Sequence, residues 1–258
     1  KGERMTKIIA VTNQKGGVGK TTTSVNVAYY LAKSGKKTLL IDFDPQGNAT
    51  SGLGIDKSNL SRTMTEVITG QATLQSAIIQ TEYKNLALAP STPHLANTEV
   101  ELAQAEGRFI RLRRAINNLQ GYYDYIIIDS PPSLSLLTVN GLIAANYILL
   151  PVQAEFYALE GLGQLLETMK LIRKGLNPQL DLLGVLPTMM DSRTTLSTQV
   201  HDEIKKHFPD RVFQTAIPRN IRLAEAPSHG LPVGAYDRFS KGARAYKALT
   251  KEILGRIG

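Results

Sequence analysis

The stretch that decides the fold is Lys15-Gly-Gly-Val-Gly-Lys-Thr-Thr22. It follows a short apolar run, Ile8 to Val11, and precedes a helical pattern of apolar residues between Val25 and Ala32. Glycines allow backbone N–H groups to curl around an anion, and the N-terminus of the following helix adds partial positive charge. A strand, a glycine-rich turn and a helix in this order predict a phosphate-binding loop.

Two side chains of this phosphate loop (residues 15–22) carry chemistry of their own. Lys20 is expected to reach the β- and γ-phosphates of a nucleotide, and the Thr21 hydroxyl to bind Mg²⁺. The common spacing of such loops requires glycine at position 14, where this chain has Gln14, and a second lysine, Lys15, follows. The loop is therefore a variant with a lysine at each end, and ATP or ADP with Mg²⁺ is its expected ligand.

The composition is that of a soluble globular protein, with 258 residues, 42% hydrophobic and 20% charged. We expect a single domain over residues 1–258, with 1–4 a tag remnant or a short extension. The absence of cysteine excludes disulfides and thiolate-held iron–sulfur clusters. A net charge of +8 favours polyanionic partners. No apolar run approaches the roughly 20 residues of a membrane-spanning helix and no signal peptide precedes Met5, so a cytoplasmic protein is expected.

Strand and helix patterns alternate along the chain, which predicts an α/β fold with a doubly wound, mostly parallel sheet and helices on both faces. The expected strands are 8–11, 37–41, 86–89, 125–129, 147–150, 180–186 and 212–217. Beyond the helix that ends near Ser34, helices are expected at 63–68, 74–79, 97–120 with a break at Gly107, 142–145, 160–174, 197 or 198 to 208, and 240–256.

Two of these strands end in acidic residues. The strand 37–41 runs into Asp42-Phe43-Asp44-Pro45, and the strand 125–129 ends at Asp129. Ligands of open α/β sheets bind at the carboxyl ends of the strands, here beside the phosphate loop. Asp129 is therefore expected to hold Mg²⁺ through water, and either Asp42 or Asp44 to position the water that attacks the phosphate.

Five motifs, in order along nearly the whole chain, resemble the Soj branch of the ParA family, DNA-partitioning ATPases that work with a ParB-type partner. They are the phosphate loop, Asp42-Phe-Asp-Pro-Gln-Gly-Asn48, Asp129-Ser-Pro-Pro-Ser133, Pro151-Val-Gln-Ala-Glu155, and residues 217–228, Ile-Pro-Arg-Asn-Ile-Arg-Leu-Ala-Glu-Ala-Pro-Ser. The first motif, with its extra lysine, fits the wider ParA/MinD group. The last motif is far more specific.

The resemblance implies a role for each matching residue. Lys15 would cross an ATP-bound homodimer to the phosphates of the other subunit, and Asp44 is preferred over Asp42 as the water-positioning residue. Residues that would hold the phosphates in the same subunit are Gly16, Gly17, Val18, Gly19, Lys20, Thr21 and Thr22. Pro218 and Asn220 match adenine contacts, and Arg193 and Arg222 match basic positions used for DNA.

The last expected helix adds local evidence for DNA. At 100° per residue its cations fall within about a third of the circumference, and its apolar residues lie opposite. The cations are Lys241, Arg244, Lys247 and Lys251, and a merely solvated basic face is the alternative. No aromatic residue interleaves them, which disfavours base stacking on single strands. The first strand begins near Lys7, so no helix-turn-helix is expected, and the contacts should be to phosphates of double-stranded DNA, independent of sequence.

Two other functions share the phosphate loop. A MinD-like ATPase of division-site placement would need an apolar, amphipathic C-terminal segment that inserts into lipid. The segment Thr250–Gly258 carries no bulky aromatic residue, and no membrane partner is expected. A metabolic P-loop ligase or kinase, such as a dethiobiotin-synthetase-like enzyme, would need a small-molecule pocket that these motifs do not reveal.

Overall fold

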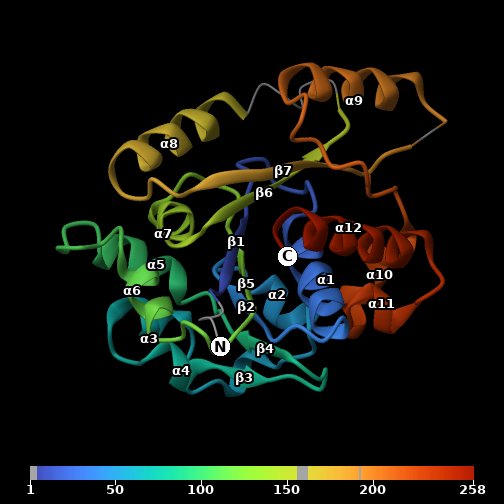
Figure 1. The fold of residues 1–258 in the computed structure, drawn as a ribbon. Helices are drawn as coiled ribbons and strands as arrows, with labels where there is room; N and C mark the ends of the chain where they lie inside the picture. Colours follow the sequence, from blue (N-terminus) through green and yellow to red (C-terminus); the bar gives the residue numbers. More distant parts are fainter. Residues whose placement is uncertain (1–4, 156–161, 192) are drawn as a thin grey trace.

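The computed structural model describes residues 5–155, 162–191 and 193–258. Its strands form one seven-stranded sheet in the order β3-β4-β2-β5-β1-β6-β7 (Figure 1). Neighbouring strands are parallel except β3 and β4, which are antiparallel. The strands are β1 (Lys7–Val11), β2 (Thr38–Asp42), β3 (Ile79–Gln80), β4 (Leu86–Ala89), β5 (Tyr125–Asp129), β6 (Tyr147–Gln153) and β7 (Asp181–Thr188).

Helices cover both faces of this sheet, as the alternating pattern predicts. One apolar core lies between the sheet and α3 (Met64–Thr69), α5 (Leu95–Glu101), α6 (Arg111–Asn117), α7 (Leu136–Ala144), α8 (Leu162–Gly175) and α9 (Thr195–His207). The second core lies under α1 (Lys20–Lys33), α2 (Asn48–Gly52), α11 (Val233–Tyr236) and α12 (Lys241–Ile257). Figure 1 shows α1 and α12 on one side of the sheet and α5 to α7 on the other. The doubly wound α/β fold is confirmed.

The remaining short elements connect these layers. They are α4 (Leu74–Ala77), α10 (Ile221–Glu225) and two 3₁₀ turns, η1 (Lys57–Asn59) and η2 (Ala226–His229). Among the described helices, none is both long enough and apolar enough to span a membrane.

The strand register brings the acidic strand ends together. Asp129 of β5 pairs with Val11 of β1 on one side and with Asp42 of β2 on the other. The phosphate loop follows β1 directly, so it lies at the same carboxyl edge as both carboxylates. Parallel strands thus place at one edge three motifs that are far apart in the sequence.

The segment 212–217 is not a strand of the sheet, and this prediction is wrong. An isolated bridge from Val185 to Val212 joins it to β7, together with two separate backbone bonds, from the Phe213 N–H to the Val185 carbonyl at 2.9 Å and from the Ile217 N–H to the Pro187 carbonyl at 2.8 Å. The backbone N–H groups of Gln214 and Thr215 bind the Glu252 carboxylate of α12 at 2.9 and 3.0 Å. Since these donors point towards α12 and Pro187 of β7 has no N–H to donate, a continuous ladder with β7 does not form.

Helix boundaries also differ from the predicted ones in places. The helix predicted over 97–120 does break at Gly107, whose φ is +67°, but its two parts, α5 and α6, are shorter than predicted and are separated by residues 102–110. Helix α9 begins at Thr195 rather than at 197 or 198, because the Thr194 hydroxyl accepts a bond from the Ser197 N–H and caps it. Residue 160, the predicted start of α8, lies outside the described residues.

Candidate functional site

The phosphate loop has the backbone of an anion cradle. Gly17 and Gly19 have φ values of +75° and +88°, which favour glycine, and no atom lies within 4 Å of where a Cβ would stand. Gly19 directly precedes α1, so the first N–H groups of this helix face the loop. The Thr188 hydroxyl at the end of β7 donates to the Val18 carbonyl at 2.9 Å and fixes the loop to the sheet. The loop is therefore open towards solvent on one side and fixed to β7 on the other.

Lys20 is the buried cation of this loop. Its residue is 6% exposed, and its Nζ donates to the Lys15 carbonyl at 2.9 Å. Burial lowers the pKa of Lys20, and the nearby carboxylates Asp129 and Asp44 oppose that shift. A buried ammonium that contacts one carbonyl has donors left over for an anionic ligand.

Asp129 is tied to the first turn of α1. Its Oδ2 accepts from the Thr21 hydroxyl at 2.8 Å, and its Oδ1 from the Ser24 hydroxyl at 2.8 Å. Burial, and then the charge of Asp42, raises the pKa of Asp129 to about 8. A buried carboxyl next to a threonine hydroxyl is a donor set of hard oxygens, which suits Mg²⁺. Ser24 was missed by sequence reasoning, although its spacing from Thr21 places both on one helix face.

The geometry separates Asp42 from Asp44. Asp42 is fully buried, and its Oδ2 accepts both the Thr50 N–H at 2.7 Å and the Thr50 hydroxyl at 2.6 Å. Burial raises the pKa of Asp42 to about 6. Among the described residues, the Asp44 carboxylate accepts a hydrogen bond from the Gln46 N–H alone, to Oδ1 at 2.9 Å. Asp42 therefore anchors α2, and Asp44 keeps an oxygen without a protein partner in the described chain.

A lysine that sequence reasoning missed holds the loop that carries Asp44. Lys57 of η1 donates to the Gln46 carbonyl at 2.9 Å. Gly47, with φ +62°, is so close that a Cβ there would lie 2.8 Å from Lys57 Cδ and 2.8 Å from the Ser91 carbonyl. No local pattern marks this lysine, because the contact joins two loops.

Lys15, the second lysine, is on the surface. Its Nζ lies 2.7 Å from Glu155 Oε2, and the two side chains are 43% and 46% exposed. Its backbone N–H donates to Asn13 Oδ1 at 3.0 Å, and Asn13 in turn donates to the Pro151 carbonyl at 2.7 Å. The first lysine of the loop thus faces outward, whereas Lys20 faces inward.

The predicted adenine contacts lie on the loop before α10. Pro218 is half-buried, and the Asn220 side-chain oxygen is buried with no hydrogen-bond donor in the described residues. A cavity of about 410 Å³ opens beside the phosphate loop, lined among others by Thr21, Thr22 and Leu223. Pro218 and Asn220 are not among its lining residues, so the structure does not join them to this cavity.

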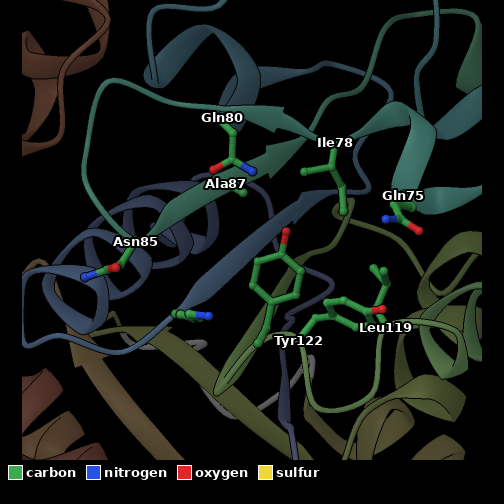
Figure 2. A pocket seen from close by; sticks show the side chains of 9 residues that line it. Gln75, Ile78, Gln80, Asn85, Ala87, Leu119 and Tyr122 are labelled. Atoms are coloured by element: carbon green, nitrogen blue, oxygen red, sulfur yellow. The ribbon is translucent and has the colours of Figure 1, made fainter.

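A second cavity, of about 500 Å³, lies at the opposite edge of the sheet (Figure 2). Its lining includes Lys37, Asn85 and Tyr123, which precede β2, β4 and β5. These are the amino ends of parallel strands, whereas the phosphate loop lies at the carboxyl ends. This cavity therefore belongs to no part of the candidate site.

The predicted basic face is formed on α12. The cations Lys241, Arg244, Lys247 and Lys251 (hereafter the basic face) are exposed, and none forms an ion pair within the described chain. Opposite them, Ala243, Tyr246, Leu249 and Ile253 are buried in the core, as predicted. The Tyr246 hydroxyl is 3.0 Å from the Thr23 hydroxyl of α1.

The two other predicted DNA residues have acidic partners. Arg193 is highly exposed but makes a two-point contact with Asp191, at 2.9 and 2.7 Å. Arg222 lies 2.7 Å from Glu225 and 3.4 Å from Asp237. Both arginines are less available to an anion than the cations of the basic face.

Known proteins match nearly the entire chain. The family described as "AAA domain" matches residues 6–182. The sporulation initiation inhibitor protein Soj of Bacillus subtilis is 53% identical over 96% of this chain and 98% of its own. The chromosome partitioning protein ParA of Myxococcus xanthus is 49% identical, over 97% and 88% of the two chains.

A solved structure agrees with the fold. It is named cobyrinic acid a,c-diamide synthase from Mycobacterium smegmatis with bound ADP and magnesium, and is 39% identical with a TM-score of 0.86. The match covers 97% of this chain and 94% of that one. With the phosphate loop, the paired carboxylates at the strand ends and these identities, the chain belongs to the Soj/ParA family of chromosome-partitioning P-loop ATPases.

Proposed function

We propose that this ATPase is a nucleotide-gated DNA clamp. Two chains pair around ATP and Mg²⁺ and bind double-stranded DNA without sequence preference. They separate when a ParB-type partner stimulates hydrolysis. The observation that carries the proposal is the basic face, four exposed cations without an ion pair among the described residues, on a helix that packs against α1, the helix after the phosphate loop. Such a row contacts phosphates, which are identical at every base pair. Nucleoid association follows from this binding.

The residues at the carboxyl edge fit a nucleotide with Mg²⁺. The open glycine cradle and the buried Lys20 ammonium suit phosphates, and the Thr21–Asp129 pair suits Mg²⁺, with Asp129 acting through water. The orphan Asn220 oxygen matches the exocyclic amine of adenine, with Pro218 beside it. The residues assigned to phosphate are Lys15, Gly16, Gly17, Val18, Gly19, Lys20, Thr21 and Thr22.

Hydrolysis needs charge neutralisation and an oriented water rather than a covalent intermediate. Bound Mg²⁺ supplies part of the neutralising charge. Lys20 neutralises phosphate charge within its own chain. Lys15 lies on the surface, and it can neutralise phosphate charge in the partner subunit only after its ion pair with Glu155 breaks. Asp44 orients the attacking water with its free oxygen. No arginine of the described chain lies in this site, so turnover should be slow until a partner acts.

Pairing explains how nucleotide controls DNA affinity. One chain offers a few phosphate contacts, which bind weakly at cellular salt. A dimer doubles the contacts in one rigid body, and the second set then binds at a high effective concentration. Arg193 and Arg222 would join the contact only by exchanging their carboxylate partners for phosphates.

The test is binding to a random-sequence duplex with ATP, with ADP and without nucleotide, over a salt series. Tight binding with ATP alone, weakening steeply with salt, is the expected result. Equal binding in all three states, or none, would refute the nucleotide-gated clamp. Liposome co-sedimentation would then test the MinD-like function.

A metabolic ligase is a second candidate, because the 39% identical structure carries an amide-synthase name and a cavity of about 410 Å³ adjoins the phosphate loop. It leaves the basic face without a role, and the relatives that are 53% and 49% identical are named for other functions. ATP turnover that depends on a small acid and an amine donor, and is unaffected by DNA, would favour it.

A further inference from the structure

Two large apolar side chains are exposed on segments that adjoin α12, the helix of the basic face. Phe239 is 72% exposed and directly precedes Ser240, which caps α12. Ile221, the first residue of α10, is 69% exposed. Large apolar side chains exposed on neighbouring segments of a folded protein are a common sign of a contact surface.

The two segments that carry them are fixed to each other. Arg222, next to Ile221, pairs with Asp237 at 3.4 Å. Asp237 also accepts the Phe239 N–H at 3.1 Å, which sets the direction of that residue's backbone. Leu223 packs so closely on Gly242 that a Cβ there would lie 2.6 Å from it. Figure 1 shows α10 beside α12. Phe239 and Ile221 therefore sit on one rigid junction.

Cations surround this junction. The Arg238 guanidinium lies 4.6 Å from the centre of the Phe239 ring. Lys241 and Arg244 follow on the first turns of α12. From Lys241 to Lys251 the basic face extends about 15 Å along the helix axis. When the basic face lies along a duplex, Phe239 is at the end of this row of cations. Phosphates of the duplex then lie on either side of its ring.

We propose that Phe239, supported by Ile221, is an apolar contact to the duplex that enters the minor groove while the basic face holds the phosphates. This inference rests on the proposed DNA function and adds a contact that charge alone does not supply. Apolar wedges framed by Arg and Lys are used in this way by minor-groove proteins. The wedge reads no base edge, so binding stays independent of sequence.

A lipid surface is the less suitable partner for this junction. Insertion into a bilayer interface needs a broad apolar face on a helix. Here the apolar face of α12, including Tyr246, Leu249 and Ile253, is buried in the core. In the described segment from α10 to α12, Phe239 and Ile221 are the exposed large apolar residues, which is enough for one groove but not for a membrane anchor.

The test separates apolar from ionic contacts by their salt dependence. Binding of the full chain to a random 30-base-pair duplex with ATP is measured across a salt series. Phe239→Ala should weaken binding about tenfold at every salt concentration, because burying the ring displaces apolar surface from water. The slope of log K against log salt should not change, since no counterion is released by a ring.

Three further variants complete the comparison. Lys247→Ala should make the slope of log K against log salt shallower, by about 0.9 for each copy of Lys247 that contacts a phosphate. Phe239→Leu should bind nearly as well as the original chain, because the contact needs apolar bulk. Tyr122→Ala removes an aromatic residue that is 62% exposed at the amino edge of the sheet, and should have no effect. All three positions are exposed, so melting temperatures should be unchanged.

The outcomes distinguish the apolar contact through Phe239 from the DNA function on which it rests. If Lys247→Ala weakens binding but Phe239→Ala does not, the wedge is refuted and the DNA function stands. If Phe239→Ala changes the slope, or if Tyr122→Ala weakens binding equally, the wedge is refuted as well. Absence of DNA binding by the original chain with ATP would overturn both. Pelleting with phosphatidylglycerol vesicles that depends on Phe239, with unchanged DNA affinity, would assign the junction to lipid.

Discussion

Replacing Asp42 and Asp44 one at a time should separate anchoring from water positioning. Asp42 is fully buried and accepts both donors of Thr50, which is itself fully buried. Alanine at position 42 would leave an N–H and a hydroxyl without partners. The Asp44 carboxylate accepts one hydrogen bond from the described residues, from the N–H of Gln46 in its own turn. The two carboxylates are two residues apart, yet replacing Asp42 should mainly lower stability and replacing Asp44 should mainly lower turnover.

The magnitudes follow from these contacts. Each buried unpaired donor costs about 1–3 kcal/mol, so Asp42→Ala should lower the free energy of unfolding by about 2–4 kcal/mol once relief of the buried carboxylate is included. For a chain of this size that is a fall in melting temperature of about 5–15 °C. Asp44→Ala should cost less than about 1 kcal/mol. Its turnover should fall about 10²–10⁴-fold, the range for removal of a proton-accepting group.

The assays are thermal unfolding without nucleotide, binding of a fluorescent ATP analogue, and ATP turnover with DNA and the ParB-type partner. Asp42→Asn is the matched control, because its amide oxygen can still accept from Thr50. It should fold, bind nucleotide and hydrolyse ATP nearly normally. A folded Asp42→Asn chain that binds nucleotide but does not turn over, together with normal turnover by Asp44→Ala, would refute the division of roles.

Three shorter predictions test the supports of the site. Lys57→Met, which removes the bond to the Gln46 carbonyl, should lower kcat about fivefold at unchanged KM; a change in KM alone would contradict it. Because burial raises the pKa of Asp129 in the folded chain, the folded state binds a proton more tightly than the unfolded state, so the free energy of unfolding should fall as pH rises from the ordinary carboxyl pKa to the raised one. Urea unfolding of Asp129→Asn should show a shallower fall, and parallel curves would disprove the shift. Tyr246→Phe should lower the melting temperature by about 2–6 °C through loss of the Thr23 bond, and calorimetry would show no change if that bond is unimportant.

The parts of this fold that were predictable from sequence depend on local signals. The phosphate loop is a continuous motif, and the strands ending at Asp42 and Asp129 are short apolar runs. Parallel pairing then forces their carboxyl ends to one edge, so the meeting of these groups could be foreseen. The basic face likewise follows from the 100° step of a helix.

The parts that could not be predicted depend on contacts between distant segments. Nothing in the sequence around Lys57 shows that it reaches Gln46, and nothing around Arg222 shows that Asp237 lies within 3.4 Å. The segment 212–217 has the apolar pattern of a strand, but Glu252 of α12 takes two of its N–H groups. Such pairings are decided by tertiary geometry and leave no periodicity to detect.

Helix α1 connects all parts of the proposed mechanism. Thr21 and Ser24 bind Asp129, Thr23 binds Tyr246 of α12, and the Asn26 side chain accepts the N–H that begins α11. Moving α12 independently of α1 would break a buried hydrogen bond and separate a packed apolar interface, which is costly. Nucleotide should therefore control DNA binding through pairing of two chains rather than by moving the basic face within one.

Control by pairing can be tested with Lys15→Ala. Lys15 is exposed, and its ion pair within the part of the chain that the structure describes is with Glu155, so its loss should cost less than about 1 kcal/mol of stability. The chain should still bind ATP through Lys20 but remain monomeric in analytical ultracentrifugation. With its basic face intact, it should bind DNA weakly and equally with ATP, with ADP and without nucleotide. ATP-dependent tight binding by a chain shown to be monomeric would mean that nucleotide does move α12, and the rigid connection through Thr23 and Tyr246 would have to be abandoned.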